Sequence, residues 1–386
     1  MAELGRWTRG MRTGLGTDTA FGAVVPPLYM TTNFTFEAHD QPRQYDYSRS
    51  GNPTRDLLAD AIATLEGAVG GTIVATGLAA ITLVAEANVP TGGRVVVQHD
   101  AYGGTWRLFS FLAQQGRFEV DFVDFNDDAA FSAALDRSPA MVWIETPSNP
   151  LLRITDLART AEAAHRAGAL VAADNTFLSP LLQRPLEHGV DIVIHSTTKF
   201  LNGHSDVVGG AVVAADEAVH ERLRLWANAL GLTGSAFDSY QTLRGLRTLD
   251  ARLRVHQENT AALIQAIQGH PAVTALHFPG LPEHPGHLVA ARQQDGFGSL
   301  FSLDLAGGVD AVTRFLEGLR IFHLAESLGG IESLVCHPAK MTHAGMTDEA
   351  RAAAGIGDGL LRFSIGLESA EDLVAVVAEA LDRAAS

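Results

Sequence analysis

A short apolar run that ends on hydroxyl residues and a lysine constrains this chain more than any other stretch. Ile192-Val193-Ile194 is β-branched and uninterrupted, which predicts a buried strand, and His195-Ser196-Thr197-Thr198-Lys199 follows directly. A lysine amine that loses part of its hydration at a strand exit deprotonates more easily and becomes nucleophilic. The hydroxyls of Ser196 and Thr198 can hold a phosphate. By itself, this stretch is equally compatible with an ordinary surface lysine after a strand.

A second predicted strand ends on a carboxylate. The apolar run Leu170–Ala173 precedes Asp174, and enough residues separate Asp174 from Lys199 for one helix-containing crossover between parallel strands. Pyridoxal phosphate (PLP) has an aldehyde that reacts with a lysine amine, a phosphate arm, and a ring nitrogen that pairs with a carboxylate. The two stretches together therefore predict a PLP site that uses Lys199 and Asp174.

The composition narrows the class of protein. The chain has 386 residues, which suits two packed domains that share a cleft, and its 46% hydrophobic content includes no run long enough to span a membrane. The net charge of −16 without basic clusters argues against a nucleic-acid partner. Cys336 is the only cysteine, so we expect no disulfide, and the spacing of the histidines does not predict a metal site. The start MAELGRWTRG has no apolar leader, which predicts a cytoplasmic protein without membrane contacts.

The order of helical and strand patterns predicts an α/β fold. From about Thr54 to Leu253 the two alternate, which predicts a mostly parallel sheet covered on both faces. The helix at Asp156–Arg166 has Thr155 as its expected N-cap, and Asp238–Leu253 is expected to be one helical stretch. The later segment predicts a smaller α/β domain with a largely antiparallel sheet. We expect an N-terminal arm over residues 1–60, a PLP-binding domain over 61–254 and a substrate-binding domain over 255–386.

Candidate site residues follow the predicted strands at their C-terminal ends, where ligands of open α/β sheets bind. These residues are Gly77, Tyr102, Asn149, Asp174, Ser196 and Lys199. Each of them alone has an ordinary structural explanation, but six such residues at one edge of one sheet favour a binding site. The arm adds the segment Tyr45–Arg55, in which Arg49 beside Gly51 can approach a phosphate closely. The apolar residues of the arm predict that it packs on another subunit.

Five motifs in the chain are long and specific: YDYSRSGNPTR, ETPSNP, DNTFLSP, HSTTKFLNGHSD and AESLGGIESL. On these motifs the chain resembles the Cys/Met-metabolism PLP-dependent enzymes, the trans-sulfuration family, from about Thr17 to the C-terminus. The resemblance implies the PLP-dependent aminotransferase-like fold (fold type I). It also implies a homo-oligomer: a dimer with shared active sites, paired into a homotetramer.

The resemblance also implies a role for each matching residue. Lys199 would form the Schiff base and move protons, Asp174 would pair with the pyridine nitrogen, and Tyr102 would stack on the ring. The expected cofactor-binding residues are Tyr47, Arg49, Gly77, Leu78, Tyr102, Asn149, Asp174, Thr176, Ser196, Thr198 and Lys199, with Tyr47 and Arg49 reaching the partner's phosphate. The expected substrate-binding residues are Tyr102, Arg107, Asn149, Glu326, Ser327 and Arg362. Among these, Arg362 and Ser327 would hold the α-carboxylate, and Glu326 would act in the γ-position chemistry.

The implied reaction is γ-replacement, in which O-succinyl-L-homoserine and L-cysteine give L-cystathionine and succinate. The alternative in the family is cleavage of cystathionine to cysteine, 2-oxobutyrate and ammonia, and the loop AESLGGIESL does not separate the two reactions. Long runs at Leu225 and His343 favour synthesis, whereas Ser50 within YSRSGNPTR is also compatible with a lyase. The leaving group stays open among succinate, acetate and phosphate. A non-catalytic regulator is disfavoured because Lys199, Asp174 and Arg362 are all present.

Overall fold

The computed structural model describes residues 4–386, so the first three residues of the predicted arm lie outside it. The chain forms two compact units, each built from two separate segments. The first unit contains the chain up to Pro90 and Leu170–Leu249, and the second contains Thr91–Ala169 and Asp250–Ser386. The predicted domain boundaries at residues 60 and 254 remain a prediction.

The first unit contains four strands in the order β1-β7-β6-β5. β5 and β6 run parallel, whereas β7 runs antiparallel to both β6 and β1, so the sheet is mixed. The strands are β1 (Gly70–Val74), β5 (Leu170–Asp174), β6 (Ile192–Ser196) and β7 (Gly210–Ala214). The helices are α1 (Arg6–Met11), α2 (Pro53–Glu66), α3 (Gly77–Asn88), α7 (Ser179–Leu182), the 3₁₀ turn η1 (Pro185–His188), α8 (Glu217–Leu230) and α9 (Ala236–Leu246).

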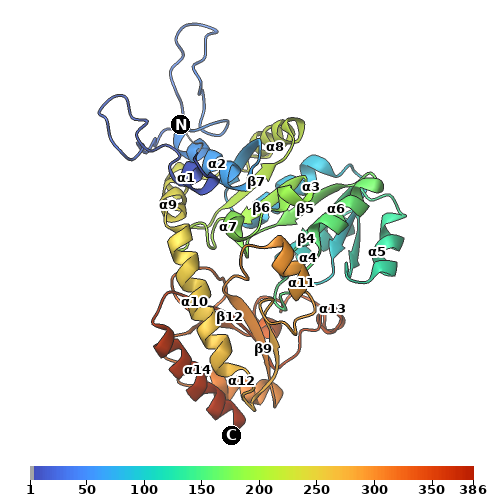
Figure 1. Cartoon of the computed structure of the whole chain (residues 1–386). Helices are drawn as coiled ribbons and strands as arrows, with labels where there is room; N and C mark the ends of the chain where they lie inside the picture. The colour runs from blue at the N-terminus through green and yellow to red at the C-terminus, as the bar shows by residue number, and fades with distance from the viewer. Residues whose placement is uncertain (1–3) are drawn as a thin grey trace. The chain divides into compact units, whose positions relative to one another are not determined.

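The segment between α1 and α2 leaves the body of this unit as long loops, drawn in dark blue (Figure 1). Apolar side chains on these loops are exposed, with Phe21 at 96%, Val24 at 71% and Met30 at 69%. The loops return to the unit at Asn52, whose side chain caps α2 by accepting hydrogen bonds from the N–H groups of Thr54 and Arg55. Exposed apolar side chains on an arm are a surface that another chain can cover.

The second unit contains three parallel strands in the order β4-β2-β3, followed in the chain by a five-stranded sheet in the order β10-β11-β12-β9-β8. All neighbours in the five-stranded sheet are antiparallel except β10 and β11, as predicted. The strands are β2 (Arg94–Gln98), β3 (Glu119–Val123), β4 (Met141–Glu145), β8 (Val273–His277), β9 (Leu300–Leu305), β10 (His323–Leu324), β11 (Leu334–Cys336) and β12 (Leu360–Ser364). The helices are α4 (Gly103–Gln114), α5 (Asp128–Leu135), α6 (Leu157–Arg166), α10 (Leu249–Ile267), α11 (His287–Gln293), α12 (Gly308–Leu316), the 3₁₀ turn η2 (Pro338–Lys340), α13 (Asp348–Ala354) and α14 (Ala370–Ala385).

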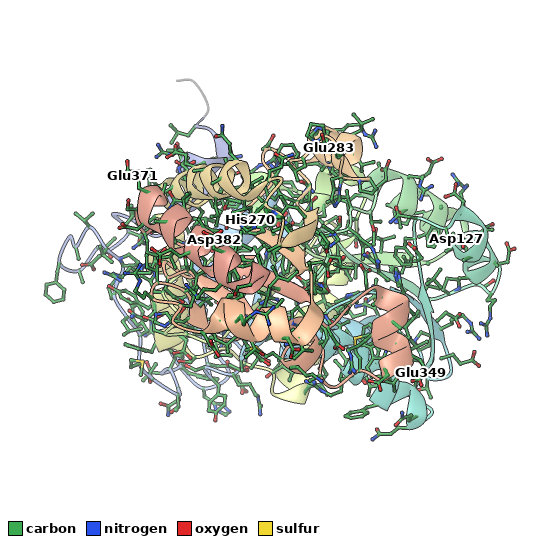
Figure 2. The ribbon with its side chains drawn as sticks, turned by 90° about the horizontal axis from the view of Figure 1, so that it is seen from below. Asp127, His270, Glu283, Glu349, Glu371 and Asp382 are labelled. Carbon is green, nitrogen blue, oxygen red and sulfur yellow. The ribbon has the colours of Figure 1, made fainter. Side chains whose placement is uncertain are left out.

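The core of the five-stranded sheet is built by helices with an apolar stripe. In α14, Leu373, Val376, Val377 and Ala380 recur at the spacing of one helix face and are buried against β9, β12 and α12. His270, which follows α10, lies beside Asp382 of α14, with 3.3 Å between Nε2 and Oδ1 (Figure 2). This packing holds β12, the strand that carries Arg362, in the interior of the unit.

Two local predictions are wrong. Asp156, not Thr155, caps α6, because its carboxylate accepts the N–H of Arg159, whereas Thr155 is buried and its hydroxyl donates to Oε1 of Gln98. The expected helix Asp238–Leu253 is two helices, α9 and α10. Within residues 4–386, none of the helices combines the length and the hydropathy of a membrane span.

Candidate active site

Lys199 lies in the turn that directly follows β6. Its backbone N–H donates to the carbonyl of Ser196 at 3.2 Å, and its own carbonyl accepts the N–H of Gly203 at 2.8 Å, so the lysine stands at a fixed position past the strand. The chain has only one other lysine, Lys340, which is exposed in η2. Lys199 is therefore the lysine that the fold holds at the end of a buried strand.

The N-terminus of α3 meets the end of β6 at the place where the phosphate cradle is expected. A Cβ atom added to Gly77, the first residue of α3, would lie only 2.8 Å from Cβ of Ser196, and one added to Gly210 would lie 2.2 Å from the carbonyl oxygen of Thr76. The first turn of a helix offers unpaired N–H groups and a positive dipole end to an anion. Glycine is thus required for the close approach, and Gly77, which Leu78 follows in the same turn, lies beside the Ser196 hydroxyl.

Thr198 and Thr176 hold the loops around this cradle. The Thr198 hydroxyl accepts the N–H of Gly209 at 3.0 Å and lies 3.3 Å from the Gly209 carbonyl oxygen, to which it donates. The Thr176 hydroxyl accepts the N–H of Ser196 at 2.8 Å and thereby joins the ends of β5 and β6. Both residues therefore fix the backbone next to Ser196.

Asp174 is the last residue of β5. Burial raises the pKa of its carboxyl group, and the hydrogen bonds from Thr176 and the charges of His195 and Lys199 act in the opposite direction. The backbone N–H of Thr176 donates to Oδ1 at 2.9 Å. A buried carboxylate of this kind is stabilised by a cationic partner, and the protonated ring nitrogen of PLP is such a partner.

A buried hydrogen-bonded pair, Glu66 and His195, joins the end of α2 to β6, and the sequence analysis did not identify it. Nε2 of His195 lies 2.7 Å from Oε1 of Glu66 at the end of α2, and the side-chain amide of Asn175 donates to the same oxygen at 2.8 Å. Glu66 and His195 are both fully buried. Glu66 follows the mostly apolar stretch Ala61–Leu65, and this position is the sequence signal that could have indicated the pair.

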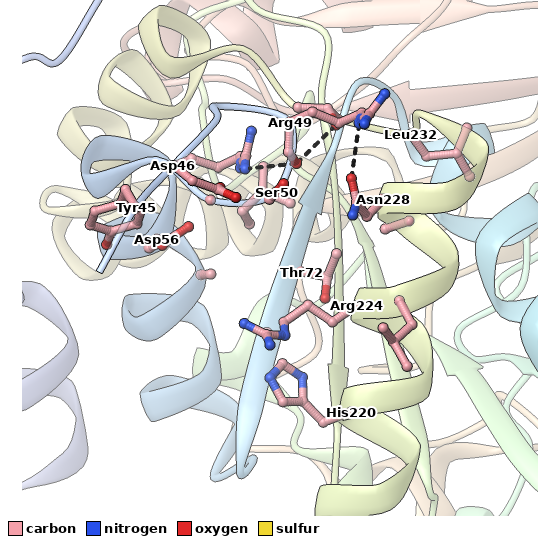
Figure 3. Close-up of a pocket in the computed structure, with 18 of the residues that line it drawn as sticks. Tyr45, Asp46, Arg49, Ser50, Asp56, Thr72, His220, Arg224, Asn228 and Leu232 are labelled. Atoms are coloured by element: carbon pink, nitrogen blue, oxygen red, sulfur yellow. Dashed lines mark hydrogen bonds between the residues drawn. The ribbon is translucent and has the colours of Figure 1, made fainter. Parts of the chain in front are cut away.

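The loop that contains Tyr47 and Arg49 contacts α8, and Figure 3 shows Arg49 beside Asn228 of this helix. Nε of Arg49 donates to Oδ1 of Asn228 at 2.9 Å, and the guanidinium lies 5.6 Å from the centre of the Tyr47 ring. Beneath the loop is a cavity of about 390 Å³ lined by charged and polar side chains, including Asp56 and His220. Tyr47 is 48% exposed, so part of this residue is accessible from outside the chain.

In the second unit, Tyr102 follows β2 and directly precedes α4 as its N-cap residue. Its backbone N–H donates to Oε2 of the buried Glu145 at 2.8 Å, and a Cβ atom on Gly104 would lie 2.4 Å from the Tyr102 ring. The ring is 41% exposed, and its pKa is raised by burial and by the charge of Glu326, while Arg107 opposes the shift. Tyr102, Arg107 and Glu326 thus lie in one electrostatic neighbourhood of this unit.

Arg362 and Asn149 form a buried pair. Nη1 of Arg362 donates to Oδ1 of Asn149 at 2.8 Å, and Nη2 donates to the carbonyl of Ser327 at 2.8 Å. Ser327 adopts a left-handed backbone with φ of 83°, which is uncommon for a residue other than glycine. Nε of Arg362 is buried and has no hydrogen-bond partner among residues 4–386. A carboxylate is the ligand that such an arginine fits best.

Each unit thus brings together its own predicted site residues. The first unit gathers the candidates for the cofactor phosphate, ring nitrogen and Schiff base, which are Gly77, Leu78, Asp174, Thr176, Ser196, Thr198 and Lys199. The second unit gathers Tyr102, Arg107, Asn149, Glu326, Ser327 and Arg362. The sequence analysis gave no role to Glu145, Glu66 or His195. A charged residue at the end of the apolar run Met141–Ile144 was the available signal for Glu145.

The fold and these residues define a PLP-dependent enzyme of fold type I. The chain belongs to the Cys/Met metabolism PLP-dependent enzyme family, whose model matches residues 8–382. It is 51% identical to cystathionine γ-synthase of Escherichia coli (strain K12) over 95% of both chains, and 40% identical to cystathionine γ-lyase of Dictyostelium discoideum over 97% of both. The crystal structure of cystathionine γ-synthase from Xanthomonas oryzae pv. oryzae in complex with aminoacrylate and cysteine is 59% identical, with a TM-score of 0.98 over 100% of this chain and 99% of the other.

Proposed function

We propose that this chain is a cystathionine γ-synthase, which converts O-succinyl-L-homoserine and L-cysteine to L-cystathionine and succinate. The observation that carries the proposal is the greater similarity to γ-synthases, at 51% and 59% identity, than to the γ-lyase relative at 40%. A second solved γ-synthase structure, also 59% identical, is a complex with cystathionine. The buried and unpartnered Nε of Arg362 further supports an amino-acid substrate.

PLP is the cofactor, and the first unit has the groups that it requires. The phosphate fits the cradle of Gly77, Leu78, Ser196 and Thr198, the ring nitrogen suits the carboxylate of Asp174 beside Thr176, and the aldehyde suits Lys199. When bound, PLP supplies an electron sink that stabilises negative charge at the carbon beside the amino group. Tyr102 and Asn149 are the side chains of the second unit that we assign to the ring face and the ring oxygen.

The protein groups bind the substrate and move its protons. Arg362 holds the α-carboxylate through its free Nε–H, with Ser327 beside it, and Tyr102 and Arg107 line the substrate. The Lys199 amine takes the Cα proton and acts as the acid and base for the following proton transfers. After the Cβ proton is lost, the bond from Cγ to the succinate oxygen breaks, and the sulfur of cysteine forms the new bond to Cγ. Glu326 lies near Tyr102 and acts at this γ-position or on the distal amino group of the product.

We propose that the active enzyme is a homotetramer built from two dimers. We also propose that it is located in the cytoplasm. In this assembly Tyr47 and Arg49 complete the phosphate site of the partner. The exposed apolar side chains of the arm, such as Phe21 and Met30, support a chain-to-chain contact, and the exposed Tyr47 ring supports a role outside its own chain. The cytoplasmic location remains a prediction from the sequence.

A product assay tests the function. The purified protein with PLP is given O-succinyl-L-homoserine with and without L-cysteine, and the products are separated by mass spectrometry. We expect cystathionine and succinate with cysteine, and 2-oxobutyrate, ammonia and succinate without it. The O-acetyl and O-phospho esters, assayed in parallel, identify the preferred leaving group. Absence of cystathionine with all three esters would contradict the proposal.

A further inference from the structure

We propose that His343 is a positioning residue for the substrate's α-carboxylate, acting through Asn149 and Arg362. The proposal rests on the function proposed above. His343 lies in the second unit, in the turn that follows β11 and η2, and it is only 1% exposed. The reaction as described does not use it, and the sequence analysis gave the His343 side chain no catalytic or binding role.

The hydrogen bonds of His343 fix its tautomer. Its Nε2 lies 3.0 Å from the carbonyl oxygen of Asn149, and a carbonyl only accepts, so Nε2 carries the hydrogen. Its Nδ1 then accepts the hydroxyl hydrogen of Thr342, whose Oγ1 lies 2.9 Å away. Both ring nitrogens are therefore satisfied, and the imidazole is held as a neutral donor aimed at the Asn149 backbone.

The same asparagine connects this donor to the arginine. The backbone of Asn149 is held by His343, while Oδ1 of its side chain accepts Nη1 of Arg362 at 2.8 Å. The neighbouring carbonyl of Pro150 accepts the Ser302 hydroxyl at 2.6 Å, which anchors the loop on its other side. The orientation of the Arg362 fork, and hence of its free Nε–H, thus depends on a loop that His343 holds in place.

The turn also approaches the start of α4. A Cβ atom on Gly103 would lie 2.6 Å from the carbonyl oxygen of Thr342, so the backbones of the two segments are in direct contact. Gly103 follows Tyr102, which lines the substrate. Thr342 and His343 therefore contact the two segments of this unit that carry Asn149 and Tyr102.

Proton transfer or metal binding by His343 does not fit this environment. Burial, and then the charge of Arg362, lower its pKa to about 4, while the Asn149 carbonyl and the carboxylate of Asp100 oppose the shift. The ring therefore stays neutral near pH 7. Because both nitrogens are already engaged, neither is available to a metal or a substrate proton. A structural role in holding Asn149 is the one that its contacts support.

The experiment compares His343→Ala and His343→Gln with wild type. Gln places an amide N–H near the position of Nε2 and can still donate to the Asn149 carbonyl, whereas Ala cannot. We expect the Ala variant to raise KM for O-succinyl-L-homoserine about tenfold with kcat within about threefold, because the lost interaction is made in the ground state as well as the transition state. The Gln variant should stay within about threefold of wild type in both constants. Cofactor content should not change.

His337→Ala is the matched control. His337 is a buried histidine of the same turn, and its Nε2 also donates to a carbonyl, that of Asp358 at 3.1 Å, which is not part of the substrate site. Its loss should lower the melting temperature without changing KM. A rise in KM with His337→Ala equal to that with His343→Ala would overturn the proposal, as would a Gln variant as impaired as the Ala variant.

A binding measurement separates this proposal from the function itself. The dissociation constant of L-norleucine, an α-carboxylate probe, is followed by the absorbance of the bound cofactor, and it should rise about tenfold in His343→Ala. This binding measurement tests the role of His343 even if the protein makes no cystathionine. If His343→Ala does not fold, Thr342→Val, which removes the hydroxyl donor to Nδ1, should weaken norleucine binding about threefold. Unchanged binding in the variant that folds would overturn the proposal.

Discussion

Lys199 is one of only two lysines in the chain, and Lys340 is a natural control for it. Replacement of Lys199 by Ala should abolish nearly all turnover, about a thousandfold or more, because the variant loses both the Schiff-base amine and the acid-base group. The phosphate cradle is intact in this variant, so PLP should still bind. Lys340→Ala should keep wild-type turnover. Steady-state rates and cofactor content of both variants check the prediction, and normal turnover in Lys199→Ala would refute the assignment of the site.

The carboxyl group of Asp174 makes the stability of the cofactor-free protein depend on pH. Burial raises its folded-state pKa above the unfolded value, so its contribution to stability is present at low pH and is lost as the pH rises through the folded pKa. Cofactor-free Asp174→Asn should therefore melt at a higher temperature than cofactor-free wild type at alkaline pH, with the difference closing in acid. With PLP bound the order should reverse, since Asn carries no charge for the ring nitrogen. A cofactor-free variant that is less stable at alkaline pH would contradict this.

The sequence indicated the residues whose own side chains are assigned to bind or react, whereas it did not indicate the residues that hold those residues in position. Lys199, Asp174 and Arg362 carry reactive or charged groups after or within apolar runs, so local sequence indicated them. His343 and Glu145 act by holding the backbones of Asn149 and Tyr102. Their partners are distant in the chain, and only the folded structure reveals such a contact.

The capped start of α2 is the element that anchors the loop with Tyr47 and Arg49. The side chain of Asn52 accepts two helix N–H groups, and its amide donates to the Tyr29 carbonyl at 3.1 Å and to the Ser48 hydroxyl at 3.2 Å. Asn52→Ala should cost about 1–2 kcal/mol of stability from the cap. It should also weaken PLP binding, because the loop that we assign to the partner's phosphate loses its anchor.

Asp127→Ala provides the control for Asn52→Ala. Asp127 caps α5 in the same way, through the N–H groups of Ala129 and Ala130, but it is exposed and belongs to no predicted site (Figure 2). Thermal unfolding and PLP titration of the two variants check the prediction. Both should lose stability, and only Asn52→Ala should lose PLP affinity. Equal PLP affinity in the two variants would contradict the proposed role of the loop in binding the partner's PLP phosphate.

Elements with strong periodicity were predicted and those without it were missed. Strands β5 and β6 and helix α6 lie where the sequence analysis predicts them, because the strands have uninterrupted apolar runs and the helix has a clear amphipathic face. Helix α4 begins with two glycines, which are poor helix formers, and it was not predicted. Strand β11 has three residues and is defined by its pairing with β12, so no local pattern could indicate it.

The complete enzyme is expected to build each active site from two chains. Arg49→Ala and Lys199→Ala are each inactive in this account, but a mixed dimer contains one site with neither change. Random pairing after joint refolding makes half of the dimers mixed, so activity should return to about a quarter of wild type. The activity of the refolded mixture, with subunit exchange verified by mass, checks this. A mixture as inactive as its parents would place Arg49 in the site of its own chain.

The direction of the reaction is the central claim, and one measurement tests it most directly. The same PLP-loaded protein is assayed for kcat/KM with O-succinyl-L-homoserine plus L-cysteine and with L-cystathionine alone, and both product sets are quantified by mass spectrometry. A γ-synthase should form cystathionine with a kcat/KM at least about tenfold above that for cystathionine cleavage, a difference of about 1.4 kcal/mol in transition-state free energy. A higher kcat/KM for cleavage to cysteine, 2-oxobutyrate and ammonia would contradict the account and identify a γ-lyase.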